Sequence, residues 1–194
     1  MSFRRTWTRF GALRRTLGPT PGVREAWHQG RRWYHVWVVD VVEPAVHARR
    51  AAVLAALGGA VDPFSAATPH VTVWVSGFVA PPPHPADGAR VTLDVGPVNA
   101  FASCPFLEVY SPELRAWRVA YARLRGDDGR PPAEDRFGPY LPHLTVARFN
   151  GEHGVQPLMA RLQTLRRLPP IRCTGTIRLG VVDAWSETGE VLAR

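Results

Sequence analysis

The stretch P-Y-L-P-H-L-T-V-A-R-F occupies residues 139–149, and a second stretch, P-H-V-T-V-W-V-S-G-F, occupies residues 69–78. Each contains a proline, a histidine and a threonine, followed by an apolar run of the kind that forms strands. Side chains two residues apart on a strand point to the same face. His70 therefore shares a face with Thr72, and His143 shares a face with Thr145. Two such pairs in one small domain suggest that two imidazoles and two hydroxyls converge on one ligand.

The two H-x-T tripeptides, one in each half of the chain, resemble the paired motifs of the 2H phosphoesterase superfamily. The likeness is greatest to its RNA 2′,3′-cyclic phosphodiesterase branch, the 2′–5′ RNA ligase family. The second motif, H-L-T-V-A-R, is close to the family's usual motif sequence, whereas the first has Ser76-Gly77 where the family often has Leu-Gly. The closing G-E-V-L-A-R, residues 189–194, also resembles the family's last strand. The resemblance spans Tyr34 to Arg194.

This resemblance implies an α+β fold of two lobes, with two antiparallel sheets that face each other across a central cleft and helices outside. Hydrophobic periodicity and turn residues favour the same class. We expect strands over residues 34–42, 70–79, 90–98, 106–110, 143–149, 171–184 and 191–193, and helices over 45–57, 111–124 and 155–168. We divide the chain into a basic N-terminal extension, residues 1–32, and a phosphoesterase-like domain, residues 33–194.

Hydrolysis of a cyclic phosphodiester needs a base for the attacking water, an acid for the leaving oxygen, and donors for the phosphoryl oxygens. Two histidines with pKa values near ~6.5 can supply a neutral and a protonated ring at neutral pH. We expect His70 and His143 to be this acid–base pair. Thr72 and Thr145 would donate to the phosphate, where charge builds up. The sequence does not say which histidine is the base.

Four further residues are candidates for contacts with the substrate. Trp74 falls on the face of His70 if the strand is regular, where it would either stack on a base or belong to the core. Tyr140 and Phe149 are the other aromatic candidates. Arg148 closes the second motif as in the family, but on an ideal strand it points away from His143, so we expect it to brace the strand or contact a distal phosphate.

Composition limits the class of protein and its partners. The chain is 45% hydrophobic, contains no apolar run of the ~20 residues that span a bilayer, and has only Cys104 and Cys173. We therefore expect no membrane segment and a reducing, cytoplasmic compartment. The formal net charge is +8, and every basic residue is Arg. Excess positive charge favours partners that carry phosphate, which agrees with an RNA or nucleotide substrate.

Two segments have both a structural and a functional interpretation. Residues 1–32 combine arginines with Phe3, Trp7 and Phe10, which favours an accessory helix, a flexible basic arm, or an arm that contacts RNA. The long polar loop over residues 126–139 leads into the second motif and would lie over the site as a lid. His84 lies in a proline-rich loop, where we expect it to be exposed.

The expected function is a metal-independent phosphodiesterase that hydrolyses 2′,3′-cyclic phosphate at RNA or nucleotide ends. It would need no cofactor and act as a monomer. Alternatives are a 2′–5′ phosphodiesterase or ligase, the reverse reaction being open to the same residues, and a nucleotide- or RNA-binding module with little catalysis. A metal-dependent hydrolase is disfavoured because the chain has no H-x-H or H-x-x-x-H pairing.

Overall fold

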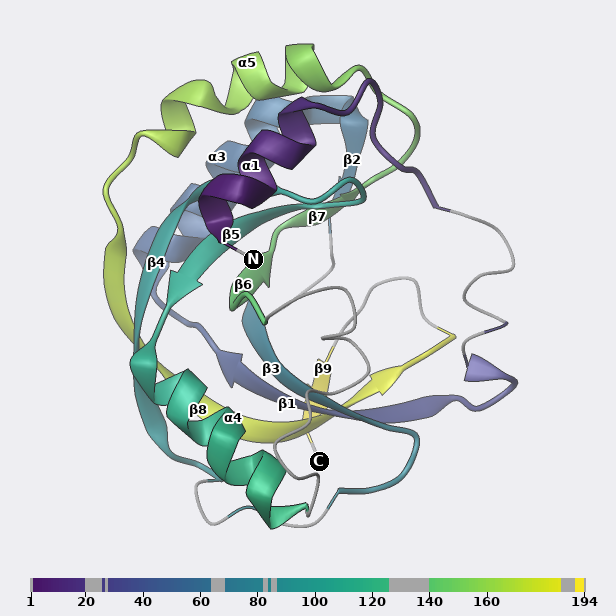
Figure 1. Ribbon diagram of the computed structural model, residues 1–194, viewed down its shortest axis with the longest axis vertical. Coiled ribbons are helices and arrows are strands. Elements are labelled where there is room, and N and C mark those ends of the chain that lie inside the picture. Colours follow the sequence, from purple (N-terminus) through teal and green to yellow (C-terminus); the bar gives the residue numbers. More distant parts are fainter. Residues whose placement is uncertain are drawn as a thin grey trace.

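A computed structural model describes residues 2–19, 26, 28–63, 69–81, 84, 87–125, 140–185 and 191–193. Its main feature is a seven-stranded antiparallel sheet that curls round on itself, with helices packed against it (Figure 1). The strands follow the order β1 (Trp33–Asp40), β3 (His70–Gly77), β6 (His143–Thr145), β5 (Pro105–Tyr110), β4 (Arg90–Ala100), β8 (Ile171–Asp183) and β9 (Val191–Ala193). A further ladder between β1 and β8 closes the first six of these strands into a ring.

The α+β class predicted from the sequence is confirmed. The expected pair of facing sheets differs from what the structure contains, because the β1–β8 ladder joins the two halves into one closed sheet. The second sheet is small and pairs β2 (Val61–Pro63) with β7 (Ala147–Phe149). The single strand expected over residues 143–149 is divided at Val146 into β6 and β7, which pair with different neighbours.

The described helices are α1 (Phe3–Gly11), α3 (Pro44–Leu57), followed by a short 3-10 turn (Gly58–Ala60), α4 (Pro112–Leu124) and α5 (Val155–Arg166). Of these, α3, α4 and α5 begin within one residue of the starts that the sequence predicts. Glu43 and Ser111 cap α3 and α4 by accepting from the backbone N–H groups of Ala45 and Leu114. In both helices a proline takes the first position, where its missing N–H costs nothing. No helix among the described residues is long and apolar enough to span a bilayer.

The two faces of the ring differ in character. We call the face covered by α3, α4 and α5 the outer face, and the opposite one the inner face (Figure 1). Along β8 the outer residues Cys173 and Ile177 are buried in the main core, whereas the alternate residues Thr174 and Thr176 are exposed. Most apolar side chains of the ring thus face outward against the helices. On the inner face a small separate cluster of Val36, Val38 and Val182 is also buried, and the other inward residues are mainly polar.

The N-terminal segment is packed onto this body. Phe10 of α1 is buried and stacks on Phe149 of β7, with ring centroids 6.0 Å apart. Beyond α1, Thr16 exchanges hydrogen bonds with the backbone of the loop before α5, accepting from the N–H of His153 and donating to the carbonyl of Gly151, both at 2.8 Å. The described part of residues 1–32 therefore includes the accessory helix that its spacing predicted.

One expectation about a single side chain is wrong. His84, expected to be exposed, is only 8% exposed. Its ring lies 4.6 Å from the ring of Trp117 and 5.5 Å from that of Tyr121, so the imidazole packs against α4.

Candidate functional site

The two H-x-T motifs lie on neighbouring strands. In the antiparallel ladder between β3 and β6, Val71 is the register partner of Leu144. Both side chains are fully buried in the main core, on the outer face. Side chains alternate along each strand, so the residues on either side of this pair all point to the inner face. These are the four motif residues His70, Thr72, His143 and Thr145.

The register also fixes which motif residues face each other. Counting one residue outward from the Val71–Leu144 pair, His70 lies opposite Thr145 and Thr72 lies opposite His143. Opposite side chains on one face of an antiparallel pair have Cβ atoms ~5 Å apart. All four side chains are half-buried, unlike the apolar residues between them. The structure thus brings the predicted acid–base and phosphate-binding residues together in one small quartet.

A proline places each motif strand. The carbonyl of Pro69 accepts from the N–H of Val41 just after β1, and the carbonyl of Pro142 accepts from the N–H of Val109 on β5. Proline has no N–H of its own, so it suits the end of a ladder, where a carbonyl alone is needed. In both motifs the histidine is therefore the first residue of its strand, held by a neighbour that is already part of the sheet.

Each histidine has an acidic register partner that the sequence analysis did not identify. Asp40 on β1 lies opposite His70, and Glu108 on β5 lies opposite His143. Both acids are ion-paired with an arginine. Arg178 donates to the two carboxylate oxygens of Asp40 at 2.5 and 3.1 Å, and Arg166 donates to Glu108 at 3.0 Å.

These ion pairs also connect the site to other parts of the fold. Arg178 also donates to the carbonyls of Val191 and Leu192, which links β9 to Asp40 beside the quartet. Glu108 further accepts from Asn99 on β4, at 2.7 Å. The acids could not have been found by motif, because they are neighbours of the histidines only across the sheet.

His143 is enclosed by aromatic rings. Phe101 and Phe106 each lie edge-on to the imidazole, with ring centroids 5.2 Å away. Its Nδ1 lies 2.8 Å from the carbonyl oxygen of Leu141. Since a carbonyl only accepts, Nδ1 carries the proton, and Nε2 of the neutral ring is left with its lone pair. Burial lowers the pKa of His143 below its ordinary value of 6.5, and the hydrogen bond to Leu141 acts in the opposite direction.

Trp74 does not share the face of the histidine before it, so that expectation is wrong. The register of β3 against β1 shifts between Trp37 and Val38, where β3 contains one extra residue. Such a β-bulge interrupts the alternation of side chains. Trp74 consequently turns to the outer face, where it is 2% exposed and lies edge-on to Tyr121 at 5.2 Å. It is a core residue.

Tyr140 lies beside the first motif strand. Its hydroxyl donates to the backbone carbonyl of Thr72 at 2.8 Å. The guanidinium of Arg118 stacks on its ring at 3.8 Å and also donates to the carbonyl of Val73. The backbone carbonyls of Thr72 and Val73 on β3 thus each accept a hydrogen bond from a side chain. Contact of Tyr140 with a substrate base stays a prediction.

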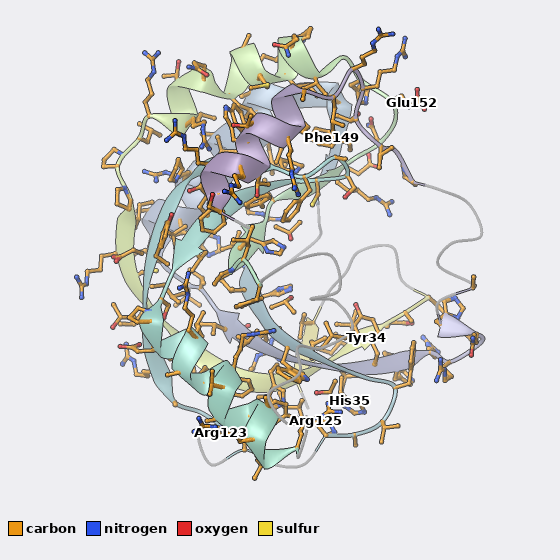
Figure 2. The ribbon with its side chains drawn as sticks, viewed as in Figure 1. Tyr34, His35, Arg123, Arg125, Phe149 and Glu152 are labelled. Atoms are coloured by element: carbon orange, nitrogen blue, oxygen red, sulfur yellow. The ribbon has the colours of Figure 1, made fainter. Side chains whose placement is uncertain are left out.

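The remaining two candidates lie on β7, away from the quartet. Arg148 is the register partner of Asp62 on β2, and its Nε is 3.7 Å from that carboxylate. This agrees with the expectation that it braces the strand. Phe149 is 1% exposed and lies in the core under α1, so its expected contact with a base is wrong. Figure 2 shows Phe149 close to α1, well separated from Tyr34 on β1.

The lid proposed over residues 126–139 lies outside the described residues. Within the described ranges, no three His, Cys, Asp or Glu side chains gather as they would around a metal ion.

Comparison with known proteins finds similar chains among solved structures. No protein-family model matches the chain, and no curated protein matches its sequence. Among solved structures, the chain is similar to the crystal structure of TT0787 of Thermus thermophilus. The two chains are 16% identical, with a TM-score of 0.42, over 77% of this chain and 87% of the other.

Proposed function

We propose that this protein is a phosphodiesterase of the 2H type that hydrolyses 2′,3′-cyclic phosphate at the end of RNA or of a nucleotide, without a metal ion. The observation that carries the proposal is the register of Val71 with Leu144, which gathers both H-x-T motifs on one half-buried, polar face. Chance can supply two tripeptides in a sequence, but it rarely aligns them side by side on adjacent strands.

The environment of His143 supports its role as the base. A base must be neutral, and burial lowers the pKa of His143, which favours the neutral ring at pH 7. The bond to Leu141 orients the ring and leaves Nε2 free to take a proton. His70 is then the acid. This division of roles could not be made from the sequence, where the two motifs are symmetric.

The reaction proceeds by exchange of one P–O bond for another. His143 removes a proton from water as the water oxygen attacks phosphorus. The bond from phosphorus to one ribose oxygen breaks, and His70 gives its proton to that oxygen. The products are a phosphate monoester and a free hydroxyl. Thr72 and Thr145 donate to the phosphoryl oxygens, where negative charge builds up during attack.

The test is hydrolysis of the four 2′,3′-cyclic nucleotides in excess EDTA by the wild type, His70→Ala and His143→Ala. Each acid–base role contributes ~10²–10⁴-fold, so each variant should lose at least a hundredfold in kcat. His47→Ala serves as the matched control, because His47 lies on α3, away from the quartet, and should keep full activity.

Three outcomes would contradict the proposal. Loss of wild-type activity in EDTA, restored by added metal, would indicate a metal-dependent hydrolase. Turnover that does not depend on either histidine would place the chemistry elsewhere. A wild type that binds the nucleotides but turns none over, including 2′–5′-linked dinucleotides, would indicate a binding module.

A further inference from the structure

A group of exposed and half-buried arginine and aromatic side chains lies at the start of β1. We call it the Arg/aromatic rim, and it consists of Arg31, Arg32, Trp33, Tyr34, Phe78 and Trp185. The guanidinium of Arg32 lies over two indole rings, at 4.6 Å from Trp33 and 5.5 Å from Trp185. Arg31 lies over the ring of Phe78 at 4.2 Å, and Phe78 in turn meets Tyr34 edge-on at 6.0 Å.

The rim is accessible and held in place. Trp185 is 57% exposed and Trp33 is 42% exposed, whereas Trp37, Trp74 and Trp117 are buried in the core. Exposed apolar surface that is contiguous, rather than scattered, marks interaction sites. Asp183 accepts from Nε and Nη2 of Arg32 at 3.1 and 3.0 Å, which fixes the guanidinium between the two indoles.

Trp33 and Tyr34 of the rim lie on β1, the strand that also carries Asp40, the acidic partner of His70. The register of β1 with β8 runs without a shift from Trp33 to Asp40, so β1 is a regular strand. Tyr34 and Asp40 are six residues apart and therefore share the inner face, about 20 Å from each other at ~3.3 Å per residue, whereas Trp33, at the end of the strand, alternates to the outer face. Figure 2 shows Tyr34 and His35 on opposite sides of β1. This distance exceeds the size of one nucleotide.

The chemistry of the rim fits single-stranded nucleic acid. Bases stack on exposed aromatic rings whatever their identity, and arginines pair with phosphates and stack as well. The net charge of +8 attracts a polyanion, whereas a neutral or basic protein partner would gain nothing from it. Stacking and phosphate contacts do not distinguish one base from another, so we expect the rim to bind without sequence specificity.

We propose that the Arg/aromatic rim binds single-stranded RNA several nucleotides away from the end that reacts at the histidines. Trp33, Trp185 and Phe78 stack on bases, and Arg31 and Arg32 contact phosphates. The choice of RNA rests on the proposed function, since only a ribose can carry a 2′,3′-cyclic phosphate. The preferred substrate is therefore an oligonucleotide end and not a free mononucleotide.

Binding is tested first, with an RNA that cannot react. Fluorescein-labelled octauridylate with a 3′-hydroxyl is titrated with the full chain, and fluorescence anisotropy is followed. Loss of one stacked base should weaken binding ~5–150-fold, so Trp185→Ala should raise Kd within that range. Leu124→Ala is the matched control, because Leu124 is similarly exposed, at 51%, on α4, and it should leave Kd unchanged. In Arg31→Ala the slope of log K against log salt should fall by about 1.

Turnover then separates this inference from the proposed function. The substrates are oligouridylates of increasing length that end in a 2′,3′-cyclic phosphate. The kcat/KM of the wild type should rise from mononucleotide to octamer. Trp185→Ala should abolish most of this rise while keeping mononucleotide turnover. Equal Kd for wild type and Trp185→Ala, or equal binding of single-stranded and duplex RNA, would overturn the rim as a stacking site. If octauridylate binds through the rim but no cyclic phosphate is hydrolysed, the proposed function is contradicted and the inference that the rim binds RNA is supported.

Discussion

Val71 lies directly opposite Leu144 in the short ladder between β3 and β6. This one relationship turns two apolar side chains to the core and, by alternation, turns two histidines and two threonines to the other face. A slip of the register by one residue would send either motif into the core. The groups that hold this register are therefore as important to the site as the residues that form it.

Tyr140→Phe tests one of these groups. The change removes the hydroxyl that donates to the carbonyl of Thr72 and leaves the ring under Arg118 in place. The free energy of unfolding should fall by ~1 kcal/mol, measured by urea denaturation. Tyr110→Phe, at a ring that is 51% exposed, should have no effect and is the control. Equal stability of wild type and Tyr140→Phe would mean that water replaces the bond.

Phe101→Ala tests the burial of His143. Removing a ring that lies 5.2 Å from the imidazole admits water, so the pKa of His143 should rise toward 6.5. A base acts only when deprotonated, and activity is therefore lost as pH falls through its pKa. In a pH profile of kcat/KM the acidic limb should lie below pH 6.5 for the wild type and move upward in Phe101→Ala.

Leu13→Ala, which removes a partly exposed apolar side chain far from the imidazole in sequence, should leave that limb in place. If the limb of Phe101→Ala coincides with that of the wild type, another group is the base.

His84→Phe tests a second buried imidazole, outside the site. Burial lowers the pKa of His84 from its ordinary value of 6.5, with the Asp87 carboxylate acting in the opposite direction. Below pH 6.5 the unfolded chain takes up a proton that the folded protein resists, so stability is full above this pH and is lost as pH falls toward the folded pKa.

The variant carries no titratable group at this position, and phenylalanine suits the surrounding rings of Trp117 and Tyr121. Its loss of Tm between about pH 7.5 and about pH 5 should be smaller than that of the wild type. His47→Gln, on α3, should behave as the wild type does. An unchanged loss of Tm in His84→Phe would show that His84 does not contribute to acid sensitivity.

Gly175→Ala tests the close approach of β8 to β1. A Cβ at this position would meet Cγ1 of Val39 and lie 2.6 Å from the carbonyl oxygen of Asp40. Overpacking of this kind costs ~1–3 kcal/mol. Because Asp40 is the register partner of His70, kcat should fall as well. Gly59→Ala is the control, since its Cβ would meet no atom within 4 Å. Unchanged stability of Gly175→Ala would mean that the strands separate at little cost.

Local patterns in the sequence were sufficient for most elements and for the quartet. Proline, cap residues and apolar periodicity placed the helices and strands, and the i, i+2 rule paired each histidine with its threonine. The failures are of another kind. Trp74 was misplaced because a β-bulge depends on how β3 meets β1, not on the residues of β3 alone. Asp40 and Glu108 were missed because cross-strand neighbours are far apart in the chain.

The short ladder between β3 and β6 has a consequence for how the proposed activity would be lost. Among the described strands this ladder has the fewest register pairs, namely one, whereas the ladder between β1 and β8 extends over the whole of β1. Proteins open first where few backbone bonds protect them. Separation of β3 from β6 would move the two histidines apart. His70 would stay on β3, paired with β1, and His143 would stay on β6, paired with β5. Hydrolysis should therefore vanish at urea concentrations that leave the circular-dichroism signal of the sheet intact, and it should return on dilution.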